Sequence, residues 1–168
     1  MNKTKRTEIL IAGGGIVGSL MAIALGDNGF EVFLVDPSFE TSYQTKRLCR
    51  SYAISRTSKR LLKKLGVWGN LDEKFEPIKK IILSESNNKT MDVTKLAEFD
   101  LQDESEEPTS YMVEDFEIRS ALNLKLRASK NVEILTHCKV LSEEIAKGGS
   151  IISLDKEKKN LRFTLRNF

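Results

Sequence analysis

The stretch ILIAGGGIVGSLMAIALGDNGFEVFLVD, residues 9–36, decides the fold of this chain. Its first four residues are apolar and predict a short buried strand. Gly13, Gly15 and Gly18 follow in a GxGxxG pattern. A helical pattern of apolar residues comes next, and a second apolar strand then ends on Asp36. A strand, a glycine turn, a helix and a second strand in this order are typical of a dinucleotide-binding unit.

Each part of this unit has a physical task. Gly13 permits the tight turn, Gly15 leaves room for a pyrophosphate against the backbone, and Gly18 allows the helix and strand to pack closely. The phosphates are expected on free N–H groups at the positive end of the helix. Asp36 lies 18 residues after Gly18, where an acid that accepts hydrogen bonds from ribose hydroxyls is expected.

A secretory signal or a membrane span is the competing interpretation of the same stretch. Residues 9–25 carry no charge, Lys3, Lys5 and Arg6 precede them, and Ala22-Ile23-Ala24 imitates a cleavage site. However, three consecutive glycines weaken such a hydrophobic segment, and this interpretation leaves the second strand and its terminal acid unexplained. The pattern therefore favours the nucleotide-binding unit.

Composition and charge exclude several other classes of function. The chain has 168 residues, enough for one core or for one nucleotide-binding domain with the beginnings of another. Of these residues 40% are hydrophobic and 30% charged, as in an ordinary soluble globular protein. A net charge of +3 is too small to indicate a nucleic-acid partner. Cys49 and Cys138 lack metal-ligand spacing and suggest a reducing, cytoplasmic location. The lone His137 supports neither a metal site nor a catalytic triad.

The segment after the unit, residues 37–55, reads as a loop at the edge of the sheet where ligands bind. Arg47, Arg50 and Arg56 lie in it or beside it. An arginine here could pair with a pyrophosphate through its planar fork of donors. The alternative for each of the three is an ordinary solvated surface charge.

The rest of the chain alternates strands and helices. Ser55 is expected to cap a helix that ends near Gly66, and Trp68 and Leu71 are expected in the core. A hairpin of 78–83 and 91–96 is expected across Asn87-Asn88, followed by an acidic solvated loop at 98–107. A strand at 111–113 then leads into a helix at 116–129, whose apolar face carries Ile118, Ala121, Leu122 and Leu126. The remaining predicted elements are a third parallel strand at 132–136 and antiparallel strands at 139–145, 151–154 and 161–165.

Together these elements predict an α/β fold with a Rossmann-like parallel sheet that binds FAD or NAD(P), and an inserted or adjacent antiparallel β layer. The expected organisation is a dinucleotide unit at about 7–36, a β insertion at about 78–113, and a helix with returning strands at about 114–166. The insertion and the returning strands are expected to build one antiparallel layer.

Three stretches of the chain resemble the N-terminal part of the flavin-dependent aromatic hydroxylases, the para-hydroxybenzoate hydroxylase-like family. The first is the unit from Gly13 to Asp36. The second is RSYAIS at 50–55 followed by LLKKLGVW at 61–68, which is similar to the family's R-x-x-A-[LI]-S and L-G-V-W segments. The third is YMVEDFEIRSAL at 111–122, similar to Y-x-V-E-N-x-x-L-R-x-x-L. Within the family, the chain most resembles the ubiquinone-biosynthesis hydroxylases that act on polyprenylated phenols.

The resemblance implies roles for individual residues. The three glycines would hold the FAD pyrophosphate, Asp36 the adenosine ribose, and Arg50 the flavin-side phosphate region. Asp115 stands where relatives usually carry an Asn or Gln that donates to the cofactor. An ionised carboxylate cannot donate, so Asp115 must turn away, stay protonated or weaken FAD binding. Arg119, one turn into the helix, would compensate or would be solvated.

The resemblance also implies a reaction. NAD(P)H reduces FAD, O₂ adds to form a flavin C4a-hydroperoxide, and its distal oxygen attacks a phenol ring. Because the cofactor carries this chemistry, no catalytic residue and no metal ligand is assigned within the chain. The alternatives are a flavin reductase or oxidase with the same nucleotide unit, and a non-catalytic remnant that binds nucleotide weakly.

A second departure from the family concerns length. Asp155 is followed by Lys156 where the family has Gly, and the chain covers under half of a usual member, as a cut piece or a naturally shortened product would. The resulting unpaired sheet edge and apolar surface predict self-association or a partner chain. A polyprenyl substrate would suit peripheral association with the inner membrane.

Overall fold

The computed structural model describes residues 4–39, 50–71, 73–86, 93–101, 107–146, 149–156 and 159–166. In chain order the elements are β1 Thr4–Thr7, β2 Ile9–Ala12, α1 Ile16–Asp27, β3 Val32–Asp36, β4 Ser51–Ser55, α3 Arg56–Lys64, the 3₁₀ turn η1 Trp68–Leu71, β5 Glu76–Pro77, β6 Lys80–Ser86, β7 Val93–Asp100, β8 Ser110–Glu114, α4 Asp115–Ala128, β9 Val132–Thr136, β10 Cys138–Ala146, β11 Gly149–Lys156 and β12 Lys159–Arg166.

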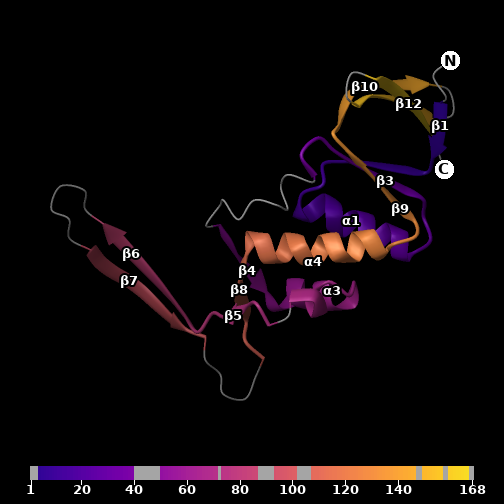
Figure 1. The fold of residues 1–168 in the computed structure, drawn as a ribbon. Helices are drawn as coiled ribbons and strands as arrows, with labels where there is room; N and C mark the ends of the chain where they lie inside the picture. Colours follow the sequence, from indigo (N-terminus) through magenta and orange to yellow (C-terminus); the bar gives the residue numbers. More distant parts are fainter. Residues whose placement is uncertain are drawn as a thin grey trace.

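A three-stranded parallel sheet in the order β2-β3-β9 lies between helices α1 and α4 and the sheet that contains β10 and β12 (Figure 1). This confirms the predicted strand–helix–strand unit and the third parallel strand, with Val32 opposite Ile9 on one side and Val132 on the other. The four apolar residues of β3 are buried. Strand β2 is only half-buried, which corrects the prediction of a buried strand, because among the described strands it has β3 as its sole neighbour.

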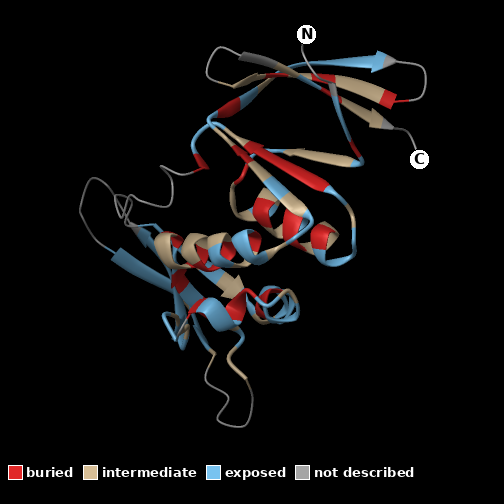
Figure 2. Cartoon of the chain, turned by 45° about the vertical axis from the view of Figure 1, so that its right-hand side comes forward, coloured by how far each residue is buried: buried red, intermediate tan, exposed pale blue. Residues whose placement is uncertain are grey.

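Two apolar cores lie on the two faces of this sheet (Figure 2). Successive side chains of a strand point to opposite faces, so Val32 and Leu34 pack with α1 and α4, while Phe33 and Val35 pack with the sheet β1-β12-β11-β10. Phe33 meets Phe163 of β12 with ring centroids 4.8 Å apart. The parallel sheet is therefore covered on both faces, as parallel sheets generally are.

The antiparallel strands form separate sheets, which corrects the prediction of a single layer. Strands β10, β11 and β12 pair as predicted, and β1, which the sequence pattern did not reveal, joins them parallel to β12. Strand β8 instead pairs with β4 and β5, and the hairpin β6–β7 forms a sheet by itself. The end of the predicted loop 37–55 is in fact strand β4, and β8 pairs with this strand instead of with the hairpin.

The other predicted elements are confirmed at slightly different boundaries. The Ser55 hydroxyl accepts a hydrogen bond from the Ser58 N–H at 3.2 Å and caps α3. Trp68 and Leu71 are buried, and the four predicted apolar residues of α4 are buried too. The acidic run begins inside β7, so its first residues are strand instead of loop. Asn87 and Asn88 lie outside the described residues. No helix in the described part of the chain is long and apolar enough to cross a membrane.

Candidate cofactor site

The glycine loop between β2 and α1 is fixed by its own backbone. Gly13 has φ of +107°, a conformation that residues with a side chain rarely adopt, and its N–H donates to the carbonyl of Val35 at 2.8 Å. A Cβ at Gly18 would lie 1.9 Å from the Gly13 carbonyl oxygen. The structure therefore explains why glycine stands at both positions. Gly13 needs a positive φ, and Gly18 lies too close to the Gly13 carbonyl for any side chain.

Gly14 is a constrained residue that the GxGxxG pattern leaves open. Its N–H donates to Oδ2 of Asp36 at 2.7 Å, and a Cβ here would lie 2.6 Å from a ring carbon of the buried Phe39. The other carboxylate oxygen, Oδ1, accepts from the Ser38 N–H at 2.7 Å. Both oxygens are thus held by backbone donors, and each keeps a lone pair for another donor such as a ribose hydroxyl.

The N-terminus of α1 offers backbone donors to an anion. Gly15 is the N-cap and makes no side-chain cap hydrogen bond, and the first turn of α1 contains no acid. A Cβ at Gly15 would meet nothing within 4 Å. The N–H groups of a first helical turn have no partner inside the helix, and their dipoles attract negative charge. Val17 in this turn is 79% exposed, so the approach to these donors is open.

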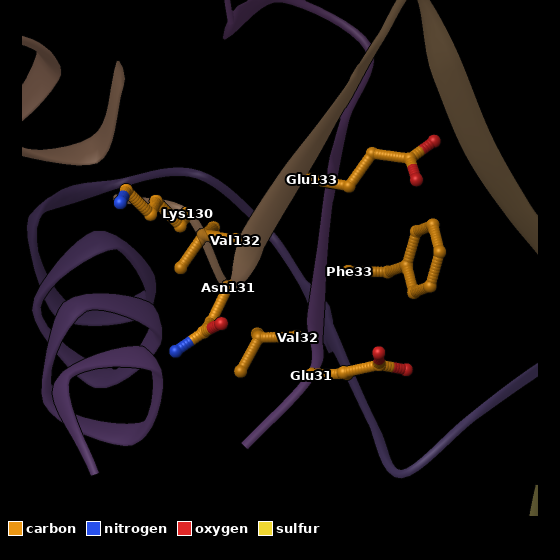
Figure 3. Close-up of a pocket in the computed structure, with 7 residues that line it drawn as sticks. All are labelled: Glu31, Val32, Phe33, Lys130, Asn131, Val132 and Glu133. Carbon is orange, nitrogen blue, oxygen red and sulfur yellow. The ribbon is translucent and has the colours of Figure 1, made fainter. Parts of the chain in front are cut away.

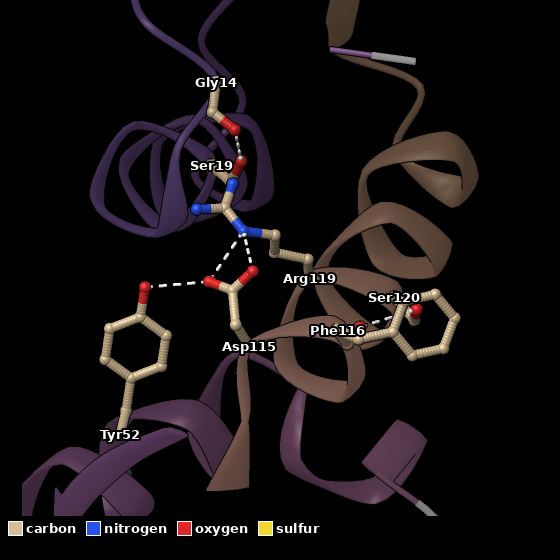
Figure 4. A network of polar contacts seen from close by, with 7 residues as sticks. All are labelled: Gly14, Ser19, Tyr52, Asp115, Phe116, Arg119 and Ser120. Carbon is tan, nitrogen blue, oxygen red and sulfur yellow. Dashed lines mark hydrogen bonds and ion pairs between the residues drawn. The ribbon is translucent and has the colours of Figure 1, made fainter. Parts of the chain in front are cut away.

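The predicted pair Asp115 and Arg119 meets at the start of α4 (Figure 4). Arg119 Nε donates to both oxygens of the Asp115 carboxylate, at 2.9 and 2.8 Å. The Tyr52 hydroxyl donates to Oδ1 of the same carboxylate at 2.8 Å. The Asp115 side chain is therefore turned toward two donors of the protein, which is the first of the alternatives expected for it. The positive charge that compensates this carboxylate comes from Arg119.

The environment keeps the Arg119 guanidinium charged. Burial by itself lowers the pKa of this group, but the hydrogen bond and charge of Asp115, together with those of Tyr52, outweigh burial and raise the pKa. Arg119 therefore presents a permanent positive charge, partly shielded from water.

The three candidate arginines before α3 have different positions. The Arg50 side chain is exposed, and its carbonyl oxygen accepts from the Asp115 N–H at 2.8 Å, so this residue lies beside the Asp115–Arg119 pair. Arg56 donates to the carbonyls of Glu107 and Pro108, away from the glycine loop. Arg47 lies outside the described residues.

A pocket of about 300 Å³ lies at the other end of the parallel sheet (Figure 3). Its lining includes Glu31, Phe33 and Glu133 at the amino ends of β3 and β9. Ligands of open α/β sheets bind at the carboxyl ends of the strands, where Gly13 and Asp36 lie. This pocket is therefore not the nucleotide site. The described residues also contain no cluster of His, Cys, Asp or Glu that could hold a metal ion.

The residues at the carboxyl edge fit the ADP half of a dinucleotide. The loop provides space in front of Gly15, uncapped N–H donors suit a pyrophosphate, and Asp36 at the end of β3 keeps lone pairs for a ribose hydroxyl. Of the residues predicted from the sequence, Gly13, Gly15, Gly18 and Asp36 lie together at the loop between β2 and α1, and Asp115 and Arg119 meet at the start of α4. The sequence pattern missed Gly14 and Tyr52, because nothing in a linear pattern shows that the Tyr52 hydroxyl on β4 reaches Asp115 at the start of α4.

Comparisons with known proteins agree with this geometry. Residues 6–158 match the model of the FAD binding domain. The ubiquinone hydroxylase UbiL of Rhodospirillum rubrum is 31% identical over 123 residues, which are 73% of this chain and 27% of that protein. A mitochondrial ubiquinone biosynthesis monooxygenase of Caenorhabditis elegans is 28% identical over 149 residues, covering 83% of this chain and 32% of its own length. The chain thus spans about a third or less of these relatives.

Among solved structures, the p-nitrophenol 4-monooxygenase from Pseudomonas putida has a TM-score of 0.76 at 16% identity, over 97% of this chain and 40% of that one. At such low identity the likeness shows a common fold. The family match is more direct evidence, since it covers most of the 168 residues, including the glycine loop, Asp36, Asp115 and Arg119. The chain therefore belongs to the FAD-binding domain family.

Proposed function

We propose that this chain is the FAD-binding part of a flavin-dependent monooxygenase of the ubiquinone-biosynthesis hydroxylase type. The observation that carries the proposal is the glycine loop, fixed to β3 through Gly13 and to Asp36 through Gly14, in a chain of the FAD-binding domain family. The ubiquinone-related names of two relatives support the type of substrate, a phenol ring that carries a polyprenyl chain.

In this proposal the chain's own residues bind and orient the cofactor. The loop glycines and the first turn of α1 hold the pyrophosphate, and Asp36 accepts from the ribose of the adenosine. Arg50 and Arg119 supply positive charge to the phosphate region on its flavin side. Bound FAD would supply the redox chemistry with O₂, after reduction by NADH or NADPH, and the protein would supply orientation and exclusion of water.

Flavin titration of a matched pair at Val17 tests the binding site. Val17 is exposed in the first turn of α1, so neither substitution disturbs the core. Val17→Glu places a negative charge where the phosphates are proposed, and we expect FAD affinity to fall by about tenfold or more. Val17→Gln has nearly the same shape without the charge and should bind within about twofold of the wild type. The measurement is quenching of flavin fluorescence.

Three contrary results have distinct meanings. Wild-type protein that fails to bind FAD would point to a remnant of the family without its function. Equal affinity of the Glu and Gln variants would place the phosphates away from α1 and contradict the proposed site. Loss of binding in both would indicate a steric effect, which also contradicts an electrostatic role for this helix end.

Oxygen uptake by the whole enzyme separates the proposal from other flavoenzymes. A hydroxylase consumes O₂ and NAD(P)H only when a phenol is present to accept the oxygen, apart from a slow background. A reductase or oxidase consumes its substrates without the phenol. NADH and NADPH are compared in the same assay. Phenol-independent uptake at the full rate would overturn the hydroxylase assignment and leave FAD binding intact.

A further inference from the structure

Tyr52, Asp115 and Arg119 form one hydrogen-bonded unit that joins β4 to the first turns of α4 (Figure 4). The side chains of Asp115 and Arg119 are only 12% and 20% exposed. Attraction between charges this far removed from water is largely offset by the cost of removing their hydration. The contacts therefore add little to stability by themselves. What they do determine is the position of the guanidinium.

The geometry of the ion pair leaves most of the guanidinium available. Asp115 is bound through Nε alone, and the guanidinium also interacts with Tyr52. The two terminal nitrogens together carry four N–H groups, more than the contact with Tyr52 uses. In Figure 4 both nitrogens point away from Asp115, and one of them is directed toward Ser19 in the first turns of α1. Helices α1 and α4 pack against each other. A planar fork in this position matches two oxygens of a phosphate.

We propose that Tyr52 and Asp115 are positioning residues that hold Arg119 against the pyrophosphate of FAD. This inference rests on the FAD binding proposed above. Arg119 touches the phosphate, and Tyr52 acts only through Asp115 and Arg119. Asp115 cannot donate to the cofactor as the Asn or Gln of relatives would. Its contribution is to accept from Arg119 and Tyr52, and these contacts fix the direction of the guanidinium.

A double-mutant cycle with two ligands tests the inference. Tyr52→Phe removes only the hydroxyl, and we expect FAD to bind about threefold to tenfold more weakly, the value of one hydrogen bond. Riboflavin has no phosphate, so its affinity should stay within about twofold. Arg119→Lys keeps a charge beside Asp115 but loses the fork. In that background Tyr52→Phe should change FAD affinity by less than about twofold, because the two residues act as a unit.

Two further variants separate positioning from a general loss of structure. Tyr111→Phe is the matched control, since this tyrosine lies on the neighbouring strand β8 and its hydroxyl bonds to Lys59, outside the proposed site. It should leave FAD affinity unchanged while far-UV circular dichroism reports a folded protein. Asp115→Asn keeps an oxygen that accepts from Tyr52 and Arg119, whereas Asp115→Ala keeps none. The Asn variant should therefore bind FAD at least about threefold more tightly than the Ala variant.

Each contrary result identifies what is wrong. Equal losses for FAD and riboflavin, or additive losses in the double mutant, would mean that Tyr52 does not act through a phosphate contact, and would overturn the inference. FAD binding that is unchanged in Tyr52→Phe would overturn it as well and leave the proposed function standing. Absence of FAD binding by the wild type would overturn the proposed function and this inference together.

Discussion

A buried lysine shows how single residues tie distant segments of this protein together. Lys59 of α3 is 7% exposed. Its Nζ donates to the Tyr111 hydroxyl at 2.6 Å, forms an ion pair with Glu107 at 2.7 Å, and lies 3.9 Å from the centre of the Tyr111 ring. These contacts fix the chain that enters β8 against α3. Burial would lower the pKa of Lys59, but the hydrogen bonds to Glu107 and Tyr111 outweigh burial and raise it.

The Lys59–Glu107 pair predicts a pH dependence of stability. The pKa of Glu107 is lowered, first by the hydrogen bond from Lys59. Its contribution is therefore present above the ordinary carboxyl value of 4.5 and is lost as pH falls through the lowered pKa. The pKa of Lys59 is raised, so its contribution is present below 10.5 and is lost as pH rises through the raised pKa. The pair stabilises the fold between these limits.

Thermal unfolding of Lys59→Met tests this dependence. Met keeps most of the apolar stem and removes the charge, so we expect a lower melting temperature at about pH 7 and a weaker loss of stability on acidification than in the wild type. Lys64→Met on the exposed side of the same helix is the control and should follow the wild-type profile. Identical acid profiles for the wild type and Lys59→Met would rule out the linkage.

At the level of single residues, the sequence predicts best those positions where backbone geometry demands a particular residue type. Gly13 and Gly18 are examples, because a left-handed turn and a carbonyl contact admit no side chain. Residues whose role depends on a neighbour from another element were missed. Gly14 is constrained by Phe39, and Tyr52 by Asp115. Such contacts between elements are determined by the tertiary structure alone.

Among the elements, α4 is the one whose buried face the sequence pattern predicted most accurately. Its apolar residues recur at helical spacing, and Ile118, Ala121, Leu122 and Leu126 all lie in the core. Between them Leu124 points to the solvent and is 61% exposed. Two leucines of one helix, two positions apart, therefore occupy opposite environments.

This contrast gives a matched test of packing. Leu122→Ala opens a cavity in a fully buried part of the core and should lower the free energy of unfolding by about 2–5 kcal/mol. Leu124→Ala makes the same chemical change at the surface and should stay within about 0.5 kcal/mol of the wild type. Urea denaturation followed by circular dichroism measures both. Similar losses for the two variants would mean that the described face of α4 is wrong.

The hairpin β6–β7 shows where element patterns are insufficient. Its strands were predicted, but the sequence did not indicate that they pair only with each other among the described strands. Ile81 faces Phe99 and Leu83 faces Ala97, so one face of the hairpin is apolar. On the other face Lys80 bonds to Glu98 at 2.5 Å. A two-stranded hairpin is marginally stable by itself, and an uncovered apolar face favours contact with another surface.

At the scale of the whole molecule, two features support the proposal that the chain self-associates or takes a partner chain. Within the described ranges β2 pairs on one side only, with β3. The apolar hairpin face adds the exposed Ile81, Leu83 and Phe99. An open strand edge and an exposed apolar surface are the two common origins of association.

Sedimentation velocity and a hydrophobic dye test this proposal. We expect the wild type to show concentration-dependent oligomers and to bind the dye. Phe99→Lys should reduce both, since it places a charge on the apolar hairpin face. Ile82→Lys adds the same charge at an equally exposed position on the opposite, charged face and should have little effect. A monodisperse monomer without dye binding would contradict the proposal.

The sequence by itself determined the dinucleotide unit, the helices and most strands, because these depend on local properties: residue periodicity, glycine conformations and helix caps. It also determined the family, through three motifs in a fixed order. The tertiary structure alone decided that β1 joins β12, that β4 pairs with β8, and that Tyr52 reaches Asp115 and Arg119. Those contacts join residues far apart in the chain, and their energies arise only when the elements pack together.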